Sequence, residues 1–397
     1  MTSMTIVPTS DQSNDAPAGQ DLVDFRSQMP VARRWAYFDH AAVAPLSAPA
    51  RDAMAAWSAE AADVGDTLYP RWRGRLEQIR ATAAGLLNAD PAAVSLVRNT
   101  TEGINLVAEG FPWREGDNVV TLANEFPSNL YPWMNQAQRG VETRRVEPRG
   151  PGVDLDALLD ACDARTRIIA VSWVGYAAGW RLDPAELVAR AHARGALVFL
   201  DAIQGLGVFP LDVGAIPVDF LAADGHKWLL GPEGAGFFYL RREHLDLLRP
   251  VGVGWHSVVD AAHFDRIDLT FRPTAARFEG GSPNVVGTFG LGASLDLLLR
   301  FGPERLGRRI LEITDLACDR LRSAGATIVS ARDGECRSGI IAFELPGQNP
   351  AAVRERLLER GVALSCRGGR LRISPHAYNN AEDVERLIEG LAAAARG

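Results

Sequence analysis

A single lysine, Lys227, is the first candidate for chemistry in this chain of 397 residues. The chain has 42 basic residues, and 41 of them are arginines. Arginine can replace lysine as surface charge, but a guanidinium stays protonated and cannot act as an amine nucleophile. Lys227 follows His226 in a turn that leads into the glycine-rich stretch 231–236. We therefore expect Lys227 to form a Schiff base, with an ordinary surface turn as the alternative.

A carboxylate ends the apolar run 197–201, which we predict to be a buried strand. Asp201 would then lie at the carboxyl end of a parallel strand, where open α/β sheets bind ligands. There it could accept the N–H of a pyridinium ring and keep that ring protonated as an electron sink. Gln204, three residues later, could donate to a ring phenolate oxygen. The alternative is that Asp201 only caps the next helix.

Two threonines, Thr100 and Thr101, follow the predicted strand 94–97 and begin a predicted helix. The free N–H groups of that helix end and the two hydroxyls could together bind a phosphate. A capping box, in which Asn99 or Thr100 pairs with the acid that follows, is the alternative, and both can hold for the same residues. A lysine, a strand-end acid and a phosphate site together indicate pyridoxal phosphate.

The order of short apolar runs and amphipathic stretches predicts an α/β fold with a mixed, mostly parallel sheet. Apolar runs without charge are typical of strands that are buried on both faces. The candidate strands are 94–97, 118–122, 168–173, 197–201, 220–223 and 236–240, and the short loop between the last two can reverse the chain. Beyond residue 283, helices at 285–300, 304–323, 350–360 and 382–394 and strands at 327–329, 339–343 and 370–374 predict a smaller α+β layer.

These patterns divide the chain into three parts. We expect residues 1–30 to form an N-terminal arm that is partly disordered. Residues 31–285 would form a large cofactor-binding domain, and residues 286–397 a small C-terminal domain. Two or three domains are the ordinary number for a chain of this length.

Composition and charge exclude several classes of protein. A hydrophobic content of 47% with 23% charged residues is typical of globular chains. The net charge of −7, with arginines scattered among acids, argues against nucleic-acid binding, and no apolar run is long enough to span a membrane. The four cysteines are widely spaced without a CxxC pair, so we expect no disulfide framework and no metal site. The chain start does not resemble a signal peptide, so a cytoplasmic enzyme is the default expectation.

Seven motifs, in the family's order, make the sequence resemble the class V aminotransferases. These are fold-type I enzymes that include cysteine desulfurases, selenocysteine lyase, kynureninase and isopenicillin N epimerase. The resemblance implies pyridoxal 5'-phosphate as the cofactor, an amino-acid substrate, and a homodimer with shared active sites. The motifs, which cover nearly the whole chain from about Tyr37, are YFDHAAVAPLS, NTTEGINLVAEG, NEFPSNLYPW, VFLDAIQ, DGHKWLLGPEGAG, RFEGGSPN and LRISPHAYNNAEDVERLIEGL.

The resemblance also assigns roles to residues at matching positions. Lys227 and Asp201 would be the catalytic pair, as the Schiff-base lysine that moves protons and the partner of the pyridine nitrogen. Arg372 would bind the substrate α-carboxylate, because its planar fork pairs with a carboxylate bidentately, and His40 would lie near the substrate. The other cofactor contacts would be Thr100, Thr101 and His226 to the phosphate, Phe126 on the ring face, Gln204 at the phenolate oxygen, and Ser282 to the phosphate of the neighbouring subunit.

The sequence departs from the desulfurase pattern at several positions. Phe126 stands where desulfurases stack a histidine, so the stack remains and a proton carrier is lost. Neither Cys336 nor Cys366 has the spacing of the nucleophilic cysteine, and a buried apolar cysteine is the more frequent case. Asp224 replaces a serine that often binds phosphate, and should repel phosphate unless it pairs with a base. Trp173 stands where desulfurases commonly have asparagine, which would alter the phenolate side of the pocket.

These features favour β-elimination at the C–S bond of a cysteine-type substrate, free or S-conjugated, without an enzyme-bound persulfide. Epimerisation, transamination and decarboxylating deamination stay open as alternatives, because a Cα carbanion can lead to each of them. A non-catalytic protein that uses the fold as a binding scaffold is the alternative of a different class. The presence of Lys227, Asp201 and Arg372 together argues against that alternative.

Overall fold

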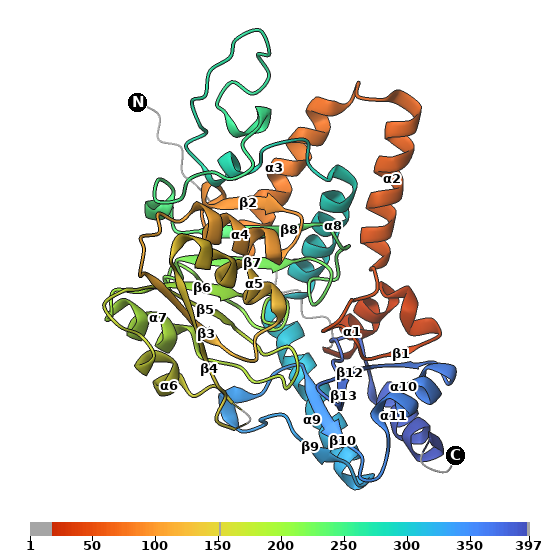
Figure 1. Cartoon of the computed structure of the whole chain (residues 1–397). Coiled ribbons are helices and arrows are strands. Elements are labelled where there is room, and N and C mark those ends of the chain that lie inside the picture. Colours follow the sequence, from red (N-terminus) through yellow and green to blue (C-terminus); the bar gives the residue numbers. More distant parts are fainter. Residues whose placement is uncertain (1–17, 151, 395–397) are drawn as a thin grey trace, which may run out of the picture.

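The computed structural model describes residues 18–150 and 152–394, so most of the predicted N-terminal arm lies outside the described residues. Within them, the centre is a seven-stranded sheet of order β2-β8-β7-β6-β5-β3-β4 (Figure 1). Of its strands, β8 runs antiparallel to both neighbours and the others share one direction, which confirms the mixed, mostly parallel sheet. The bounds are β2 Val94–Val97, β3 Asn118–Leu122, β4 Glu142–Val146, β5 Thr166–Ser172, β6 Leu197–Asp201, β7 Phe220–Asp224 and β8 Gly236–Leu240.

Helices surround this sheet (Figure 1), and the four predicted beyond residue 283 begin within one residue of their predicted starts. Helix α7 begins after Asp183, whose side chain accepts the N–H of Ala185, with Pro184 in the first turn. The bounds are α1 Ala18–Ser27, α2 Ala48–Val64, α3 Tyr69–Leu86, α4 Thr100–Gly110, α5 Tyr131–Met134, α6 Leu155–Asp160, α7 Pro184–His192, α8 Val285–Phe301, α9 Pro303–Ser323, α10 Pro350–Glu359 and α11 Ala381–Ala394. Among the described helices, none alone is long and apolar enough to cross a membrane, and α8 and α9 meet that test only as a pair bent by 83°.

The large sheet separates two hydrophobic cores because alternate residues of a strand face opposite sides. In β6, Val198 and Leu200 join one core, which also contains residues of α7 and α8. Phe199, between them, joins the other core, together with Ile104 of α4. Burial of both faces explains why these strands read as apolar runs without charge.

A four-stranded antiparallel sheet, of order β12-β13-β10-β9, forms a second layer in the described chain. It shares a separate core with parts of α9, α10 and α11, in which Phe343 and Leu387 are fully buried. This layer confirms the α+β region expected at the C-terminal end. Its strands are β9 Thr327–Ile328, β10 Ile341–Glu344, β12 Ser365–Arg367 and β13 Arg370–Ile373.

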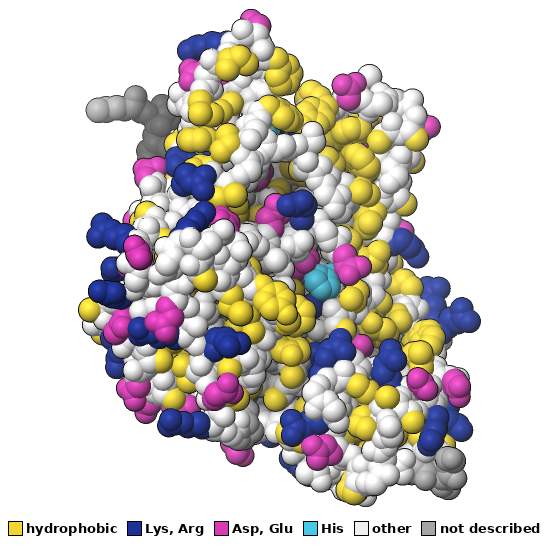
Figure 2. Space-filling model, in the orientation of Figure 1, with side chains coloured by type: hydrophobic (Ala, Val, Ile, Leu, Met, Phe, Trp, Pro, Cys, Tyr) yellow, Lys and Arg dark blue, Asp and Glu magenta, His cyan; other side chains and the backbone are white. Residues whose placement is uncertain are grey.

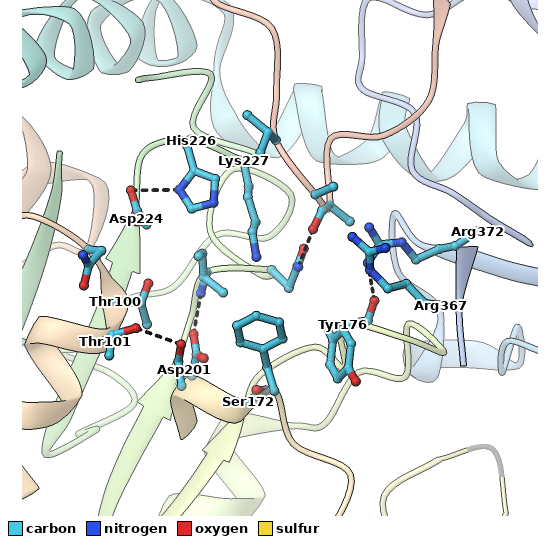
Figure 3. A pocket seen from close by; sticks show the side chains of 18 residues that line it. Thr100, Thr101, Ser172, Tyr176, Asp201, Asp224, His226, Lys227, Arg367 and Arg372 are labelled. Atoms are coloured by element: carbon cyan, nitrogen blue, oxygen red, sulfur yellow. Dashed lines mark hydrogen bonds and ion pairs between the residues drawn. The ribbon is translucent and has the colours of Figure 1, made fainter. Parts of the chain in front are cut away.

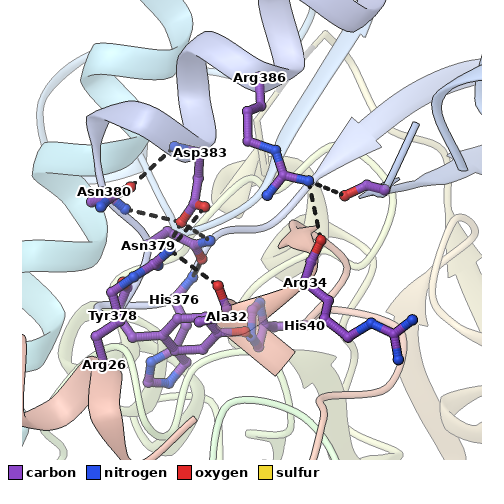
Figure 4. Close-up of polar contacts among 11 residues, drawn as sticks. Arg26, Ala32, Arg34, His40, His376, Tyr378, Asn379, Asn380, Asp383 and Arg386 are labelled. Carbon is purple, nitrogen blue, oxygen red and sulfur yellow. Dashed lines mark hydrogen bonds and ion pairs between the residues drawn. The ribbon is translucent and has the colours of Figure 1, made fainter. Parts of the chain in front are cut away.

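The N-terminal segment also joins this second layer, which the sequence did not predict. Strand β1 (Ala36–Tyr37) pairs in parallel with β11 (Val362–Ala363), and Phe38 lies in the second core. Arg26 of α1 forms an ion pair of 2.7 Å with Asp383 of α11, which is almost completely buried (Figure 4). The two ends of the described chain are therefore joined by a strand pair and an ion pair.

Helix α9 links the two layers. Its residue Leu306 lies in the first core and its residue Leu321 in the second, whereas Leu291 of α8 belongs to the first. The chain thus passes between the cores within α9, some residues after the limit predicted at 285.

Residues 253–270 form a segment that protrudes beyond the large sheet and its helices, at the top of Figure 1. Hydrophobic side chains gather on it in the space-filling view (Figure 2). Its exposed apolar residues include Phe264, Leu269 and Ile267, the last of which is 95% exposed. Exposed apolar side chains that gather in this way mark an interaction surface.

Candidate active site

The carboxyl ends of the parallel strands meet at a cavity of about 350 Å³ (Figure 3). Strands β5, β6 and β7 end at Ser172, Asp201 and Asp224, and all three side chains line it. The smaller layer closes the cavity with side chains from β12 and β13. The lining residues that carry polar or aromatic groups are Asn99, Thr100, Thr101, Phe126, Ser128, Ser172, Tyr176, Asp201, Gln204, Asp224, His226, Lys227, Arg367 and Arg372.

Lys227 lies in the turn after β7 and is 8% exposed. Burial lowers the pKa of its amine from 10.5 to about 8, although the Asp201 carboxylate acts in the opposite direction. With that pKa about a tenth of the amine is neutral at pH 7. Its Nζ lies 5.6 Å from the centroid of the Phe126 ring. A partly neutral amine beside an aromatic face in a cavity suits a Schiff-base lysine.

Asp201 ends β6 and is 3% exposed. Its Oδ1 accepts the backbone N–H of Ile203 at 3.1 Å. Burial raises the pKa of the carboxyl from 3.8 to about 6, while the Ile203 hydrogen bond and the charge of Lys227 lower it. The group is still mainly ionised at pH 7, and a positively charged ligand in the cavity would stabilise that form.

The first turn of α4 forms one end of the cavity. Asn99 is the cap of this helix, since its Oδ1 accepts the N–H of Glu102 at 2.9 Å. The buried Thr100 hydroxyl has no hydrogen-bond partner among the described residues, and Thr101 donates to the Ser128 hydroxyl at 2.8 Å. The helix cap is thus present, and the unpartnered hydroxyl beside a helix N-terminus also fits a phosphate.

The imidazole of His226 and the carboxylate of Asp224 lie together beside this helix end, with Nδ1 and Oδ1 3.0 Å apart (Figure 3). Asp224 is therefore paired with a base. The sequence required such a partner, because an unpaired acid would repel a phosphate. The histidine is 16% exposed and the acid 4%. A phosphate at this end of the cavity would meet the imidazole together with the carboxylate rather than an isolated negative charge.

The amide of Gln204 is held on both sides. Its Nε2 donates to the carbonyl of Ala41 at 2.9 Å, and its Oε1 accepts the indole N–H of Trp228 at 2.8 Å. One of the two amide protons is left for a ligand in the cavity. An amine, a carboxylate, an aromatic ring and hydrogen-bond donors for a phosphate thus surround a single cavity. This set of groups fits pyridoxal 5'-phosphate.

Arg372 of β13 is almost completely buried at the other end of the cavity. Its guanidinium donates to the hydroxyl of Ser365 at 3.1 Å, the carbonyl of Tyr176 at 2.6 Å and the carboxylate of Asp39 at 3.2 Å. Burial lowers the pKa of Arg372, and the Asp39 charge acts against this. Two of its five N–H donors are left, which is enough for one bidentate carboxylate.

Two predicted residues do not line this cavity. His40 is fully buried beside it, with its ring nitrogens 2.8 Å from the Ser374 carbonyl and 2.8 Å from the Tyr378 hydroxyl (Figure 4). Both ring nitrogens of His40 therefore already have partners, and neither is free for the expected contact with a substrate. Ser282 is exposed and lines a different cavity, of about 530 Å³.

Trp173 does not line the cavity either, contrary to the expectation that it shapes the phenolate side. Its ring packs on the side of Phe209 and Gly205, where the backbone of Gly205 approaches it closely. Tyr176, three residues later, lines the cavity instead, with its ring centroid 5.2 Å from that of Phe126. Gly175 lies between the two residues, and a glycine at that point is a turn signal that the sequence reasoning did not use.

Sequence reasoning also missed two charged groups. Arg367 lines the cavity beside Arg372 (Figure 3). Glu125 lies behind Ser172 and accepts both its backbone N–H, at 2.7 Å, and its hydroxyl. Glu125 stands next to Phe126 in the NEFPSN motif, which was the only available signal.

Comparisons with known proteins agree with this arrangement. The family model described as Aminotransferase class-V matches residues 36–387. A probable cysteine desulfurase of Methanothermobacter thermautotrophicus is 33% identical over 93% of this chain and 96% of that protein. Isopenicillin N epimerase of Streptomyces clavuligerus is 32% identical over 83% of this chain and 87% of that protein. The crystal structure of the cysteine desulfurase CsdA of Escherichia coli is similar with a TM-score of 0.85 at 28% identity, covering 94% of this chain and 98% of that one.

The fold and the site define a pyridoxal phosphate-dependent enzyme of fold type I. The chain belongs to the class V aminotransferase family. The resemblance, the fold class and the cofactor expected from the sequence are thereby confirmed. The family contains both desulfurases and an epimerase, so membership alone leaves the reaction open.

Proposed function

We propose that this enzyme cleaves the C–S bond of a cysteine-type amino acid, free or S-conjugated, by β-elimination and without an enzyme-bound persulfide. The observation that carries the proposal is a cavity without a thiol. All four cysteines lie in the described residues, and none of them lines the cavity of Lys227. Cys336 is exposed, and the Sγ of Cys366 donates to the carbonyl of Pro350 at 3.2 Å. Burial raises the pKa of Cys366, which disfavours the thiolate that a nucleophile needs.

Sulfur chemistry is supported by the relatives, since the Methanothermobacter protein is named a probable cysteine desulfurase. Bound pyridoxal phosphate supplies a protonated ring that accepts the electron pair released at Cα. We assign Lys227 to cofactor attachment and proton transfer, Asp201 to the ring N–H, Phe126 to the ring face, Gln204 to the phenolate oxygen, Thr100, Thr101 and His226 to the phosphate, and Arg372 to the substrate carboxylate.

Lys227 is the proton carrier in this proposal. A pKa of about 8 lets its Nζ accept a proton from Cα and return it to the leaving group at neutral pH. Phe126, on the ring face, has no proton to exchange. Proton transfer on the Lys227 side and sulfur release therefore require no thiol from the protein.

Epimerisation is the second candidate function. It is favoured by the 32% identity to isopenicillin N epimerase and by Tyr176, a hydroxyl-bearing residue of the cavity wall whose ring lies next to that of Phe126. Epimerisation needs a proton delivered to Cα on the side opposite Lys227. The two reactions differ in their products, because only elimination destroys the amino acid.

A substrate panel tests the proposal. We expect equal amounts of pyruvate, ammonia and the sulfur product, which is hydrogen sulfide from L-cysteine and a thiol from an S-alkyl-L-cysteine. The Cys336→Ala and Cys366→Ala variants should keep that turnover. The Lys227→Ala variant should lose both the turnover and the visible absorbance of lysine-bound pyridoxal phosphate. Formation of the D-amino acid without pyruvate would support the epimerase instead. Loss of turnover in either cysteine variant would contradict a mechanism without persulfide.

We also propose that the enzyme is a homodimer in which Ser282 contacts the phosphate in the neighbouring subunit. Ser282 is exposed in its own chain and lines a cavity distinct from that of Lys227. The protruding segment 253–270 carries exposed apolar side chains that a second copy would cover.

A further inference from the structure

Two guanidinium groups, of Arg367 and Arg372, lie side by side at the substrate end of the cavity (Figure 3). Their surroundings differ. Arg372 is almost completely buried and forms an ion pair with Asp39 at 3.2 Å. Arg367 is half-buried, and its hydrogen bond is from Nη1 to the carbonyl of Cys366 at 2.8 Å. No ion pair joins Arg367 to an acid among the described residues.

The charges at this end of the cavity can be counted. The positive charge of Arg372 is offset by the negative charge of Asp39, which leaves the charge of Arg367 without a counterion. Arg367 is close enough for its charge to lower the pKa of both Arg372 and Lys227. A positive charge facing a cavity without a protein counterion is stabilised when the ligand is an anion.

We infer that Arg367 supplies the net positive charge that binds the substrate α-carboxylate, and that Arg372, neutralised by Asp39, orients that carboxylate through its two remaining N–H donors. Arg367 uses one of its five donors on the protein, so it also has N–H groups to share. The count of one net charge matches one carboxylate. This inference rests on the proposed function in one respect, that the ligand is an amino acid.

The same count limits the substrate. If the substrate carried a second carboxylate next to Arg367, the single uncompensated positive charge could balance only one of the two carboxylates. The side chain of the substrate is therefore expected to be uncharged near this end, as in cysteine thioethers with alkyl groups. Asp39 sets this limit, since its removal would leave two uncompensated guanidinium groups.

Calorimetric titration of the holoenzyme with 3-(methylthio)propanoate tests the inference, because this carboxylate contains sulfur but has no amine to react. We expect Arg367→Gln to weaken its binding roughly 10- to 100-fold, the worth of a charge-assisted hydrogen bond. Asp39→Asn in the Arg367→Gln background should restore about tenfold of that loss, because the charge of Arg372 is then uncompensated. Arg354→Gln is the matched control, since Arg354 donates to the Leu364 carbonyl and lines a neighbouring cleft rather than this cavity.

With the monoanionic probe, three results would overturn the inference. They are unchanged binding in Arg367→Gln, a double variant that binds no better than Arg367→Gln, and an equal loss in Arg354→Gln. A dianionic probe, 3-(carboxymethylthio)propanoate, should bind the wild type no more tightly than the monoanion, and tenfold tighter binding would contradict the count of one charge. None of these titrations depends on turnover. Binding in the expected pattern without pyruvate from any cysteine substrate would therefore count against the proposed function alone.

Discussion

Glu125 is a buried carboxyl next to the candidate active site that the proposed mechanism does not use. Its oxygens accept the backbone N–H and the hydroxyl of Ser172, at the end of β5. Burial raises its pKa from 4.5 to about 7, and the nearby charge of Asp201 adds to this. At neutral pH the protein thus holds a mixture of protonated and ionised Glu125, and the ionised form carries a cost in stability.

Replacement of Glu125 by glutamine should remove part of the pH dependence of stability. The folded pKa lies above the unfolded value, so the contribution of Glu125 is fully present below pH 4.5 and is lost as the pH rises to about 7. Between pH 5.5 and 8 the wild type should lose roughly 2 kcal/mol relative to Glu125→Gln, by proton linkage. Urea unfolding of both proteins at the two pH values measures this difference. Parallel pH profiles would show that Glu125 is ionised throughout.

Helix α4 packs against the large sheet, and its first turn forms the end of the cavity that we assign to the phosphate. It lies against β7 through Gly103, where an added Cβ would be 2.6 Å from the Cβ of Ala222. Such a distance is below the van der Waals limit, so the helix can lie this close to the sheet only with glycine at that position. The position of Thr100, three residues earlier, depends on this contact.

The Gly103→Ala variant should therefore weaken cofactor binding without touching the cofactor. The added methyl group forces α4 away from β7, at a cost of about 1–3 kcal/mol in stability. We expect pyridoxal phosphate to dissociate at least severalfold more readily, measured by the decay of its protein-bound absorbance on dilution. The control is Gly74→Ala in α3, where an added Cβ meets nothing within 4 Å and should leave the cofactor bound and stability equal or slightly higher. Equal effects of the two substitutions would contradict the role of the close contact.

At the scale of the whole molecule, the exposed Ser282 lies on a surface that a second copy of the chain could cover. Ser282 and the neighbouring Gly280 and Gly281 line a cavity that Lys227 does not line. The loop that carries Ser282 is fixed by Glu279, whose carboxylate accepts the backbone N–H of Leu96 at 2.8 Å and pairs with Arg80. The rigid base of an exposed serine suits a contact with a second copy of the chain.

The proposed dimer can be tested by measuring molecular mass and cofactor retention together. Light scattering should give twice the chain mass of 42.9 kDa for the holoenzyme. Ser282→Ala should preserve that mass and weaken pyridoxal phosphate binding roughly tenfold, the worth of one hydrogen bond to a charged group. Ser323→Ala, at an exposed serine of α9, should change neither. A monomer with full cofactor retention would contradict shared sites.

Much of the fold could be predicted because the signals are local. The strands β2, β3, β6 and β8 have the predicted bounds, since charge-free apolar runs between turns mark buried strands. Strand β4 was missed because its sequence, ETRRV, is charged and only partly buried at the edge of the sheet. The pairing of β1 with β11 could not be predicted, because nothing in two short apolar stretches more than 300 residues apart specifies their contact.

The sequence by itself determined the chemistry of the site. A lone lysine after one strand, an aspartate at the end of another and threonines at a helix start are set by local order, and parallel strands bring their ends to one edge. The tertiary structure alone decided how the charged groups are placed: Asp224 lies beside His226, Asp39 pairs with Arg372, and Arg367 pairs with no acid in the described part of the chain. Those pairs depend on side chains that reach across turns or between segments distant in sequence. Their geometry is fixed by packing of the two layers, which no local pattern records.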